Sequence, residues 1–489
     1  MIRASRARIA VAAAIAVCLA AAGCTNVTGG RGAVRPTAAT LPTSASPSGS
    51  PPGSPSPTGS ADCPATYAAP DPQRPKVALA FTLAPDLTSV RGTEHVSFTP
   101  DLPITELVFR LTANSAPSVA AGNRIQVTSA TASPGAGPAS YTATNAAPST
   151  QGGLLHLPFS KPIPAGSTVT ADLAFTVTLG QQSFDRFGRA ADGAQGYAWF
   201  GSAQPLLAWE RGFGWHTEGM LNFTAESATS EAMDTSLTVT APAADTVIMS
   251  GDPAQPSATG GTRTWHASVA AARDVSVAVG PFSVSDTVVQ GVRLRVGAYQ
   301  PRLRDQLVPE FTRAITELAK RFGPFPYPSL SVARVPSEGG GIEYPSSILM
   351  LDGSRVVAVH ETAHQWFYAM VGDSQALHPW MDEAFAVYAE EQLDGESEPP
   401  GTLRAPGTVD KSAESYGDNV DDYYFVTYSK GAAALNEARA VAGAAPWDAA
   451  VRCYVNKNAW RIANPPDFAA AIKQFPKAVA VLRQAGALP

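Results

Sequence analysis

The hydrophobic pattern of this chain changes its period at about residue 285, and that change limits the fold to two parts of different class. From residue 65 to 285, short runs of alternating apolar and polar residues are separated by Gly, Pro, Asn and Asp. Such alternation between turn residues is typical of β-strands in a sandwich. We therefore predict an all-β, sandwich-like domain over residues 63–285, with its clearest strands at 76–83, 106–111, 168–179 and 237–240.

After residue 285 the apolar residues recur every three or four positions, as on one face of a helix. A helix is predicted to begin near residue 303 and to reach Phe322 despite Pro309, with a strand following at 329–335. Further helical patterns cover 356–371, 380–392, 429–441 and 467–475. Residues 286–489 are therefore predicted to form an α+β domain, of a size that is common for one domain.

The charge balance excludes one class of function. The formal net charge is −6, from 35 Lys and Arg against 41 Asp and Glu, and the chain has no basic run. Nucleic-acid-binding proteins carry basic patches that neutralise phosphates. A role on DNA or RNA is not expected.

Residues 1–23 have the pattern of a secretory signal. Arg3, Arg6 and Arg8 precede an apolar run from Ile9 to Ala22, which is too short to span a membrane. The residues before Cys24 resemble a bacterial lipobox, which implies that Cys24 is lipidated. The alternative is an ordinary signal peptide followed by an incidental cysteine.

Residues 24–62 are rich in Pro, Ser, Gly and Thr and contain no aromatic residue. A segment of this composition cannot bury enough apolar surface to fold. We expect a disordered tether that holds the folded part away from a membrane surface. Together with the signal, it predicts an extracytoplasmic protein anchored to the cell membrane as a lipoprotein.

Two of the four cysteines lie in the predicted domains, Cys63 and Cys453. An oxidising compartment favours a disulfide between them, which would join the start of the first domain to the end of the second. Spacing alone leaves the alternative of two unpaired cysteines open.

The sequence His360-Glu361-Thr-Ala-His364 predicts a metal site. On a helix, residues four apart share a face, so both imidazoles can bind one zinc ion, and Glu361 lies beside them. A catalytic zinc site needs a third protein ligand and keeps a position for water. Glu383, 19 residues after His364 at the start of the next predicted helix, is the candidate.

These residues resemble the aminopeptidase N family of zinc metallopeptidases, which are gluzincins with the spacing HExxH-x18-E. Beyond HETAHQW and the glutamate of DEAFAVY, the stretch Gly340-Gly-Ile-Glu-Tyr344 takes the place of the family's GAMEN motif, on a strand beside the zinc helix. Tyr428-Ser-Lys-Gly431 matches its YxKG motif. The resemblance implies an N-terminal β domain followed by a thermolysin-like catalytic domain with one zinc ion per chain.

The resemblance also implies a role for each residue. Glu361 would act as general base on a water activated by zinc, and the Tyr428 hydroxyl would help to stabilise the oxyanion. Glu343 would pair with the free α-amine of a peptide, and the backbone of Gly340 and Gly341 would contact the substrate. Departures occur at Ile342 and Tyr344, where Met and Asn are usual, and at Tyr368, where larger relatives usually have Gly.

The leading prediction is a monomeric zinc aminopeptidase that acts on the N-termini of peptides or proteins. A zinc endopeptidase on the same site, or a catalytically inert peptide-binding lipoprotein, are the alternatives. Only about 60 residues follow Tyr428, so the long helical C-terminal domain of larger relatives is missing and a more open cleft is expected. The remaining polar candidates are assigned no chemistry: His216 is predicted to pack in a loop, and Glu390 and Glu391 to form a solvated helix face.

Overall fold

The structure is a computed structural model of the chain, and it describes residues 63–181, 186–223, 229–395, 397–399 and 401–489. The predicted signal peptide, Cys24 and the tether up to residue 62 lie outside the described residues. Residues Pro64–Pro489 form one compact unit. Within the described part, no helix is both long and apolar enough to cross a membrane.

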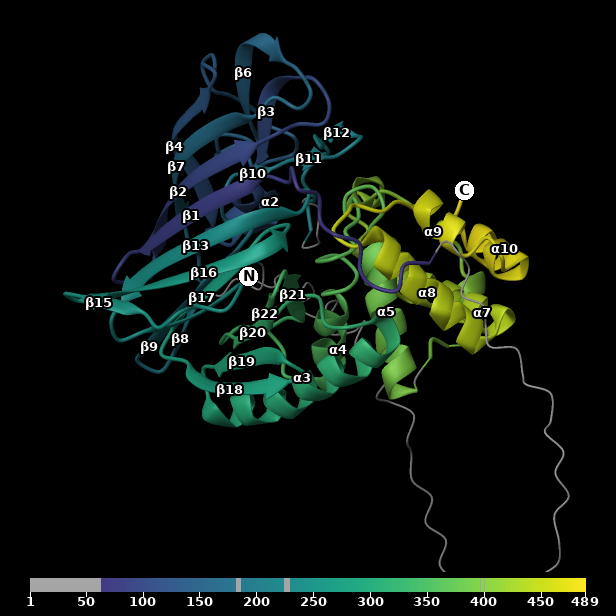
Figure 1. Cartoon of the computed structure of the whole chain (residues 1–489). Helices are drawn as coiled ribbons and strands as arrows, with labels where there is room; N and C mark the ends of the chain where they lie inside the picture. Colours follow the sequence, from purple (N-terminus) through teal and green to yellow (C-terminus); the bar gives the residue numbers. More distant parts are fainter. Residues whose placement is uncertain (1–62, 182–185, 224–228, 396, 400) are drawn as a thin grey trace, which may run out of the picture. The chain divides into compact units, whose positions relative to one another are not determined.

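A seven-stranded sheet forms the centre of the N-terminal part (Figure 1). Buried and exposed residues alternate along its central strands, which matches the period-2 pattern of the sequence. Neighbouring strands of this sheet are antiparallel, except that β1 (Lys76–Leu83) and β13 (Met233–Pro242) run parallel. The order is β15 (Ser257–Thr259), β16 (Thr262–Ala272), β13 (Met233–Pro242), β1 (Lys76–Leu83), β2 (Ser89–Phe98), β7 (Val169–Thr178) and β4 (Arg124–Ser133).

Smaller sheets cover the inner face of this sheet and complete one apolar core. The predicted all-β class is confirmed, and each predicted strand overlaps an observed one. The first small sheet contains β10 (Leu206–Leu207), β3 (Ile104–Arg110), β6 (Leu154–Ile163) and β5 (Ser140–Thr142). The second contains β14 (Thr246–Met249), β17 (Ser276–Gly280), β9 (Gln195–Gly201) and β8 (Phe187–Asp192); β11 (Trp209–Glu210) pairs with β12 (Gly214–Trp215), and α2 is Ala116–Ala120.

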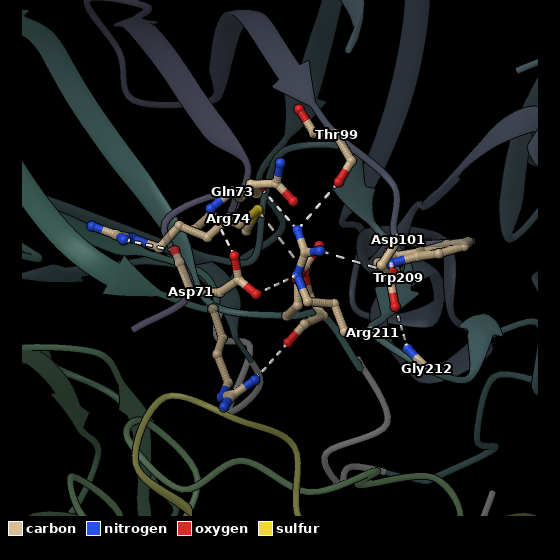
Figure 2. Close-up of polar contacts among 12 residues, drawn as sticks. Asp71, Gln73, Arg74, Thr99, Asp101, Trp209, Arg211 and Gly212 are labelled. Carbon is tan, nitrogen blue, oxygen red and sulfur yellow. Dashed lines mark hydrogen bonds and ion pairs between the residues drawn. The ribbon is translucent and has the colours of Figure 1, made fainter. Parts of the chain in front are cut away.

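Arg211, directly after β11, is the centre of a polar network that we call the Arg211 hub (Figure 2). Its guanidinium Nε lies 2.8 Å from Glu231 Oε2, and one terminal nitrogen donates to a backbone carbonyl at 2.8 Å. The hub comprises Arg211, the carboxylates of Asp71, Asp101 and Glu231, and the carbonyls of Gln73 and Thr99. It joins the chain before β1 to the end of β2 and to the segment before β13.

The predicted boundary at residue 285 falls inside a strand. β18 (Ser283–Val289) forms a hairpin with β19 (Val292–Ala298), which continues into the sheet β18-β19-β20-β22-β21 of the C-terminal part. The change of architecture therefore comes just before Ser283. The other strands are β20 (Ser329–Arg334), β22 (Ser347–Met350) and β21 (Gly341–Tyr344).

A long helix, α3 (Pro301–Phe322), packs along β18 and β19 of this sheet (Figure 1). The predicted helix is confirmed, and Pro309 lies inside it. The remaining helices form the end of the chain: α4 (Arg355–Ala363), α5 (Trp380–Asp394), α6 (Val420–Tyr424), α7 (Gly431–Ala442), α8 (Ala444–Asn458), α9 (Pro465–Ala471) and α10 (Pro476–Ala485). The α+β class is confirmed, whereas α6, α8 and α10 lie outside the predicted helical ranges.

The helix predicted over 356–371 is too long, because α4 ends at Ala363. Tyr368 has φ of 116°, a left-handed conformation that no helix contains. Arg273, after β16, donates to the carbonyl of Tyr368 at 2.9 Å and to that of Arg461 at 2.7 Å. A Cβ at Gly372 would lie 2.1 Å from the Arg273 guanidinium carbon, so glycine makes room for it. Tertiary contacts therefore override the apolar pattern of this segment.

Cys63 and Cys453 are both disulfide-bonded in the structure, as the predicted pairing requires. Residues that follow Cys63 form hydrogen bonds with α8: the Asn456 side chain donates to the Pro64 carbonyl at 2.8 Å, and Ala68 N donates to Asn456 O at 2.8 Å. The start of the described chain is thus held by the C-terminal helices.

Candidate active site

The two predicted histidine ligands lie at the end of α4. Ser354 caps this helix, and its hydroxyl accepts from Val357 N. His360 is in the last turn and His364 is the C-cap, so both rings lie on one face, with centroids 4.7 Å apart. The i, i+4 spacing places them together as predicted.

The third predicted ligand, Glu383, lies in the first turn of α5. Its Oε2 is 3.2 Å from His360 Nε2 and 3.4 Å from His364 Nε2. The ligand atoms of these three residues all lie within 4.8 Å of one another. Two imidazole nitrogens and one carboxylate oxygen are the donor set of a catalytic zinc site, so the residues present fit this metal.

The charges of this cluster are strongly coupled. Burial by itself would raise the pKa of Glu383, but hydrogen bonds from His360 and His364 hold it well below its usual range. Burial lowers the pKa of His364, yet Glu343 and Glu383 outweigh that effect and bring it to about 9. The surrounding carboxylates therefore favour positive charge at the point where the three ligand atoms meet.

The outer nitrogens of the two imidazoles have different partners. His360 Nδ1 lies 2.5 Å from Glu390 Oε1, and His364 Nδ1 lies 3.1 Å from the Phe367 carbonyl. The predicted solvated face at Glu390 and Glu391 is wrong for both residues. Glu391 is half-buried, and its carboxylate accepts from Asn436 Nδ2 and from Glu398 N. Helix α5 turns this face toward α4 and α7.

The predicted general base, Glu361, is buried beside the ligands. Its Oε2 has no hydrogen-bond partner among the described residues, and burial raises its pKa to about 8. β21 crosses directly over it: a Cβ at Gly341 would lie 2.4 Å from Glu361 Cγ. Gly341 is thus required for the close approach of strand and base. At Gly340 a Cβ would meet no atom within 4 Å.

The predicted amine anchor, Glu343, lies on β21 and is buried next to the ligand cluster. One of its carboxylate oxygens, one atom of His364 and one of Asp382 all lie within 4.8 Å of one another. The flanking departures, Ile342 and Tyr344, point into an apolar core. A Cβ at Gly201 would lie 2.0 Å from the Tyr344 hydroxyl, so a glycine of β9 makes room for this tyrosine.

The predicted oxyanion donor, Tyr428, lies on a single π-helical segment, Phe425–Lys430. Such segments often occur at functional sites. The Tyr428 ring is parallel to that of His360, with centroids 6.0 Å apart and an interplanar angle of 4°. Lys430 is buried and bonds two carbonyls of the preceding loop, and a Cβ at Gly431 would lie 2.5 Å from Ala384 Cβ on α5. The last two residues of the motif therefore hold the segment that carries Tyr428.

Glu390 is a member of this site that the sequence did not predict. Glu383 and Glu390 are seven residues apart, which is two turns of a helix, so both face the same way. That spacing was visible in the sequence. The packing of α5 on α4, which brings Glu390 to His360, was not.

Comparison with known proteins gives a consistent picture. Residues 345–484 match the family described as "Peptidase family M1 domain". Two curated relatives from Oryza sativa subsp. japonica are similar over 31% of this chain: Aminopeptidase M1-A is 24% identical over 188 residues, and Aminopeptidase M1-B is 28% identical over 189 residues. This chain spans about a fifth of the length of these relatives, since each match covers 21% of the relative.

Solved structures show the likeness over most of the chain. An M1 zinc metallopeptidase from Deinococcus radiodurans has a TM-score of 0.62 at 19% identity, over 85% of this chain and 94% of the other. A mutant of a two-domain M1 zinc metallopeptidase, bound to L-tryptophan, has a TM-score of 0.62 at 18% identity, over 86% and 96% of the two chains. The likeness confirms the predicted two-domain fold class.

Proposed function

We propose that this chain, whose residues 345–484 match the M1 peptidase domain, is a zinc aminopeptidase that removes residues from the N-termini of peptides. One observation carries the proposal: Glu343 lies within 4.8 Å of His364, so a carboxylate stands next to the three predicted zinc ligands. The curated relatives in rice are named aminopeptidases, which supports the same activity for this chain.

His360, His364 and Glu383 would hold the metal. A zinc ion supplies Lewis-acid activation of water and of the scissile carbonyl. Glu361 takes the proton of the attacking water through Oε2, and the water oxygen bonds to the carbonyl carbon. The same carboxyl group then gives the proton to the leaving nitrogen as the C–N bond breaks. The backbone of Gly341 packs closely against the Glu361 side chain and restricts its position.

Tyr428 provides the hydroxyl for the second half of the chemistry. As the carbonyl carbon becomes tetrahedral its oxygen gains negative charge, and an O–H donor aimed at that oxygen stabilises the transition state. The Tyr428 ring is parallel to the ring of the predicted ligand His360, with centroids 6.0 Å apart, which supports this role. Lys430 and Gly431 hold its segment against α5 and the preceding loop.

Glu343 selects the bond that is cut. A buried carboxylate pairs strongly with an ammonium group that also leaves water. A peptide whose free α-amine binds Glu343 has its first peptide bond next to the zinc ligands, which is exopeptidase geometry. If Glu343 is only structural, the same zinc ligands and base serve an endopeptidase instead.

The test is mass spectrometry of a peptide mixture incubated with the full-length chain. Each peptide is supplied with a free and with an acetylated N-terminus, and Glu361→Gln is the blank. Stepwise loss of N-terminal residues from free peptides alone is expected. Internal cuts in both sets would establish the endopeptidase, and bound zinc without turnover would establish an inert binding protein.

We further propose that the protein is an extracytoplasmic lipoprotein anchored through Cys24. The support is the sequence: a basic and then apolar segment ends at Gly23-Cys24, and a Pro- and Ser-rich tether follows. Cells that express the wild type are compared with cells that express Cys24→Ala. We expect the wild type in the detergent phase of a Triton X-114 partition and the variant in the aqueous phase. Equal partition of the two proteins would favour an ordinary signal peptide.

A further inference from the structure

The two predicted histidine ligands are held in different ways by the protein around them. His364 Nδ1 lies 3.1 Å from the backbone carbonyl of Phe367, three residues along the chain. His360 Nδ1 lies 2.5 Å from the Glu390 carboxylate, on another helix. The first contact is present in any sequence that folds this turn. The second depends on one side chain.

Glu390 reaches His360 because α5 presents two carboxylates on one face. Glu383 lies in its first turn and Glu390 two turns later, and α5 packs against α4. The His360 ring lies between them, with Nε2 3.2 Å from Glu383 Oε2 and Nδ1 2.5 Å from Glu390 Oε1. Helix α5 thus provides the carboxylates that contact both ring nitrogens of His360.

The contact is shielded from water. The side chains of His360 and Glu390 are only 14% and 16% exposed, so solvent screens the pair weakly. Charge-assisted hydrogen bonds of this kind are shorter and about twice as strong as neutral ones. A carboxylate on Nδ1 favours the tautomer with a proton on Nδ1, which leaves the lone pair of Nε2 directed toward Glu383 and the ligand cluster.

We propose that Glu390 is a positioning residue that fixes the tautomer and the ring orientation of His360 and thereby strengthens zinc binding. The inference rests on the proposed function in one respect, that His360, His364 and Glu383 bind zinc. Partners of this kind typically change metal affinity by about 10- to 100-fold. Glu390 itself does not touch the substrate or the metal.

The next residue provides a matched control. Glu391 lies on the same helix, is also half-buried, and accepts from Asn436 and from the Glu398 backbone rather than from a histidine. Glu390→Gln and Glu391→Gln make the same chemical replacement, carboxyl to amide, at adjacent positions. Glu390→Asp keeps the charge and shortens the reach.

The experiment measures zinc affinity of the metal-free full-length chain by competition with a fluorescent zinc chelator. We expect Glu390→Gln to bind zinc about 10- to 100-fold more weakly than the wild type, and Glu391→Gln to match the wild type within about twofold. The thermal midpoints of the metal-free proteins show whether each variant is folded. In the cobalt-substituted proteins, the visible absorption bands should shift in Glu390→Gln and not in Glu391→Gln.

Three outcomes separate the claims. Equal zinc affinities for the two glutamine variants would overturn the positioning role while leaving the proposed function intact. If the wild type fails to bind one zinc ion per chain, both proposals are wrong. If Glu390→Gln does not fold, Glu390→Asp decides, and unchanged zinc affinity in that folded variant would overturn the role.

Discussion

Two histidines in this molecule lie between two carboxylates each, one in the β domain and one in the candidate active site. His216 Nε2 is 2.7 Å from Glu210 Oε2 and its Nδ1 is 2.9 Å from Glu218 Oε1. His360 has the corresponding contacts with Glu383 and Glu390, at 3.2 and 2.5 Å. A histidine between two carboxylates therefore does not by itself identify a functional site.

The two sites differ in the other groups that contact these carboxylates. At His216, Arg110 contacts Glu218, and the Phe213 ring stacks on the imidazole at 4.6 Å. The imidazole of His216 is completely buried. At His360, the oxygen that faces Nε2 also faces a second imidazole, His364, at 3.4 Å. The first network is complete within the chain, whereas the second directs several ligand atoms at one point. Convergence of ligand atoms separates a metal site from a structural ion network.

The largest expected effect is a loss of turnover at the candidate active site, the second of the two sites compared. Glu361→Gln removes the proposed general base, and we expect kcat to fall by about 10²- to 10⁴-fold. Zinc content and the free energy of unfolding should stay close to those of the wild type, because Glu361 Oε2 makes no hydrogen bond among the described residues. Peptide turnover, bound zinc and chemical unfolding are measured on the same sample. A variant with normal turnover would show that another group is the base.

The second prediction tests the other histidine. His216→Ala leaves Glu210 and Glu218 in the buried network without the imidazole, and removing one partner of a buried pair costs about 3–5 kcal/mol of stability. We expect a loss of this size in urea unfolding, with kcat and zinc affinity of the folded fraction unchanged. Loss of zinc binding in this variant would mean that the two networks are not separate.

How far the sequence predicts these networks depends on how local they are. His360, Glu361 and His364 lie on one helix, so their spacing alone brings them together. The sequence pattern indicated a solvated Glu390, because its contact with His360 exists only once α5 packs on α4. The predicted helix over 356–371 extends too far for a similar reason. The apolar run Trp366–Val371 continues the pattern of α4, but Arg273, which directly follows β16, donates to the carbonyl of Tyr368 and holds this turn.

The third prediction concerns Glu343, which distinguishes exopeptidase from endopeptidase. A hydrogen bond to a charged group contributes about 1.5–3 kcal/mol, which corresponds to roughly 10- to 150-fold in kcat/KM. We expect Glu343→Gln to lose about this factor on peptides with a free N-terminus. N-acetylated peptides, which lack the amine that Glu343 would bind, should be turned over by neither the wild type nor the variant. The measurement is the ratio of the wild-type to the variant kcat/KM on the free peptides, and an unchanged kcat/KM would show that Glu343 does not bind the α-amine.

The smallest expected effect is a pH dependence that belongs to His216 alone. Burial lowers the pKa of His216, but hydrogen bonds from its two nitrogens to Glu210 and Glu218 outweigh this and raise it above the usual value. Arg110 also faces this pair through Glu218. A group whose pKa is raised on folding stabilises the protein fully below its unfolded pKa, and this stability is lost as the pH rises through the folded pKa. The free energy of unfolding is therefore compared between wild type and His216→Gln from about pH 6 to about pH 9, a range that begins near the unfolded pKa of histidine.

We expect the stability advantage of the wild type over His216→Gln to shrink as the pH rises, because the imidazolium that both carboxylates require loses its proton. Groups at the active site titrate in both proteins, so their contribution cancels in the difference. His95→Gln is the control: His95 and Asp172 form a pair at 2.8 Å, but their side chains are 51% and 69% exposed, and exposed pairs contribute about 0–1 kcal/mol. A difference between wild type and His216→Gln that does not change with pH would show that His216 acts by shape. The contacts of His216 with Glu210 and Glu218 would then stabilise the protein through packing alone. His216 would resemble His360 in geometry but not in charge.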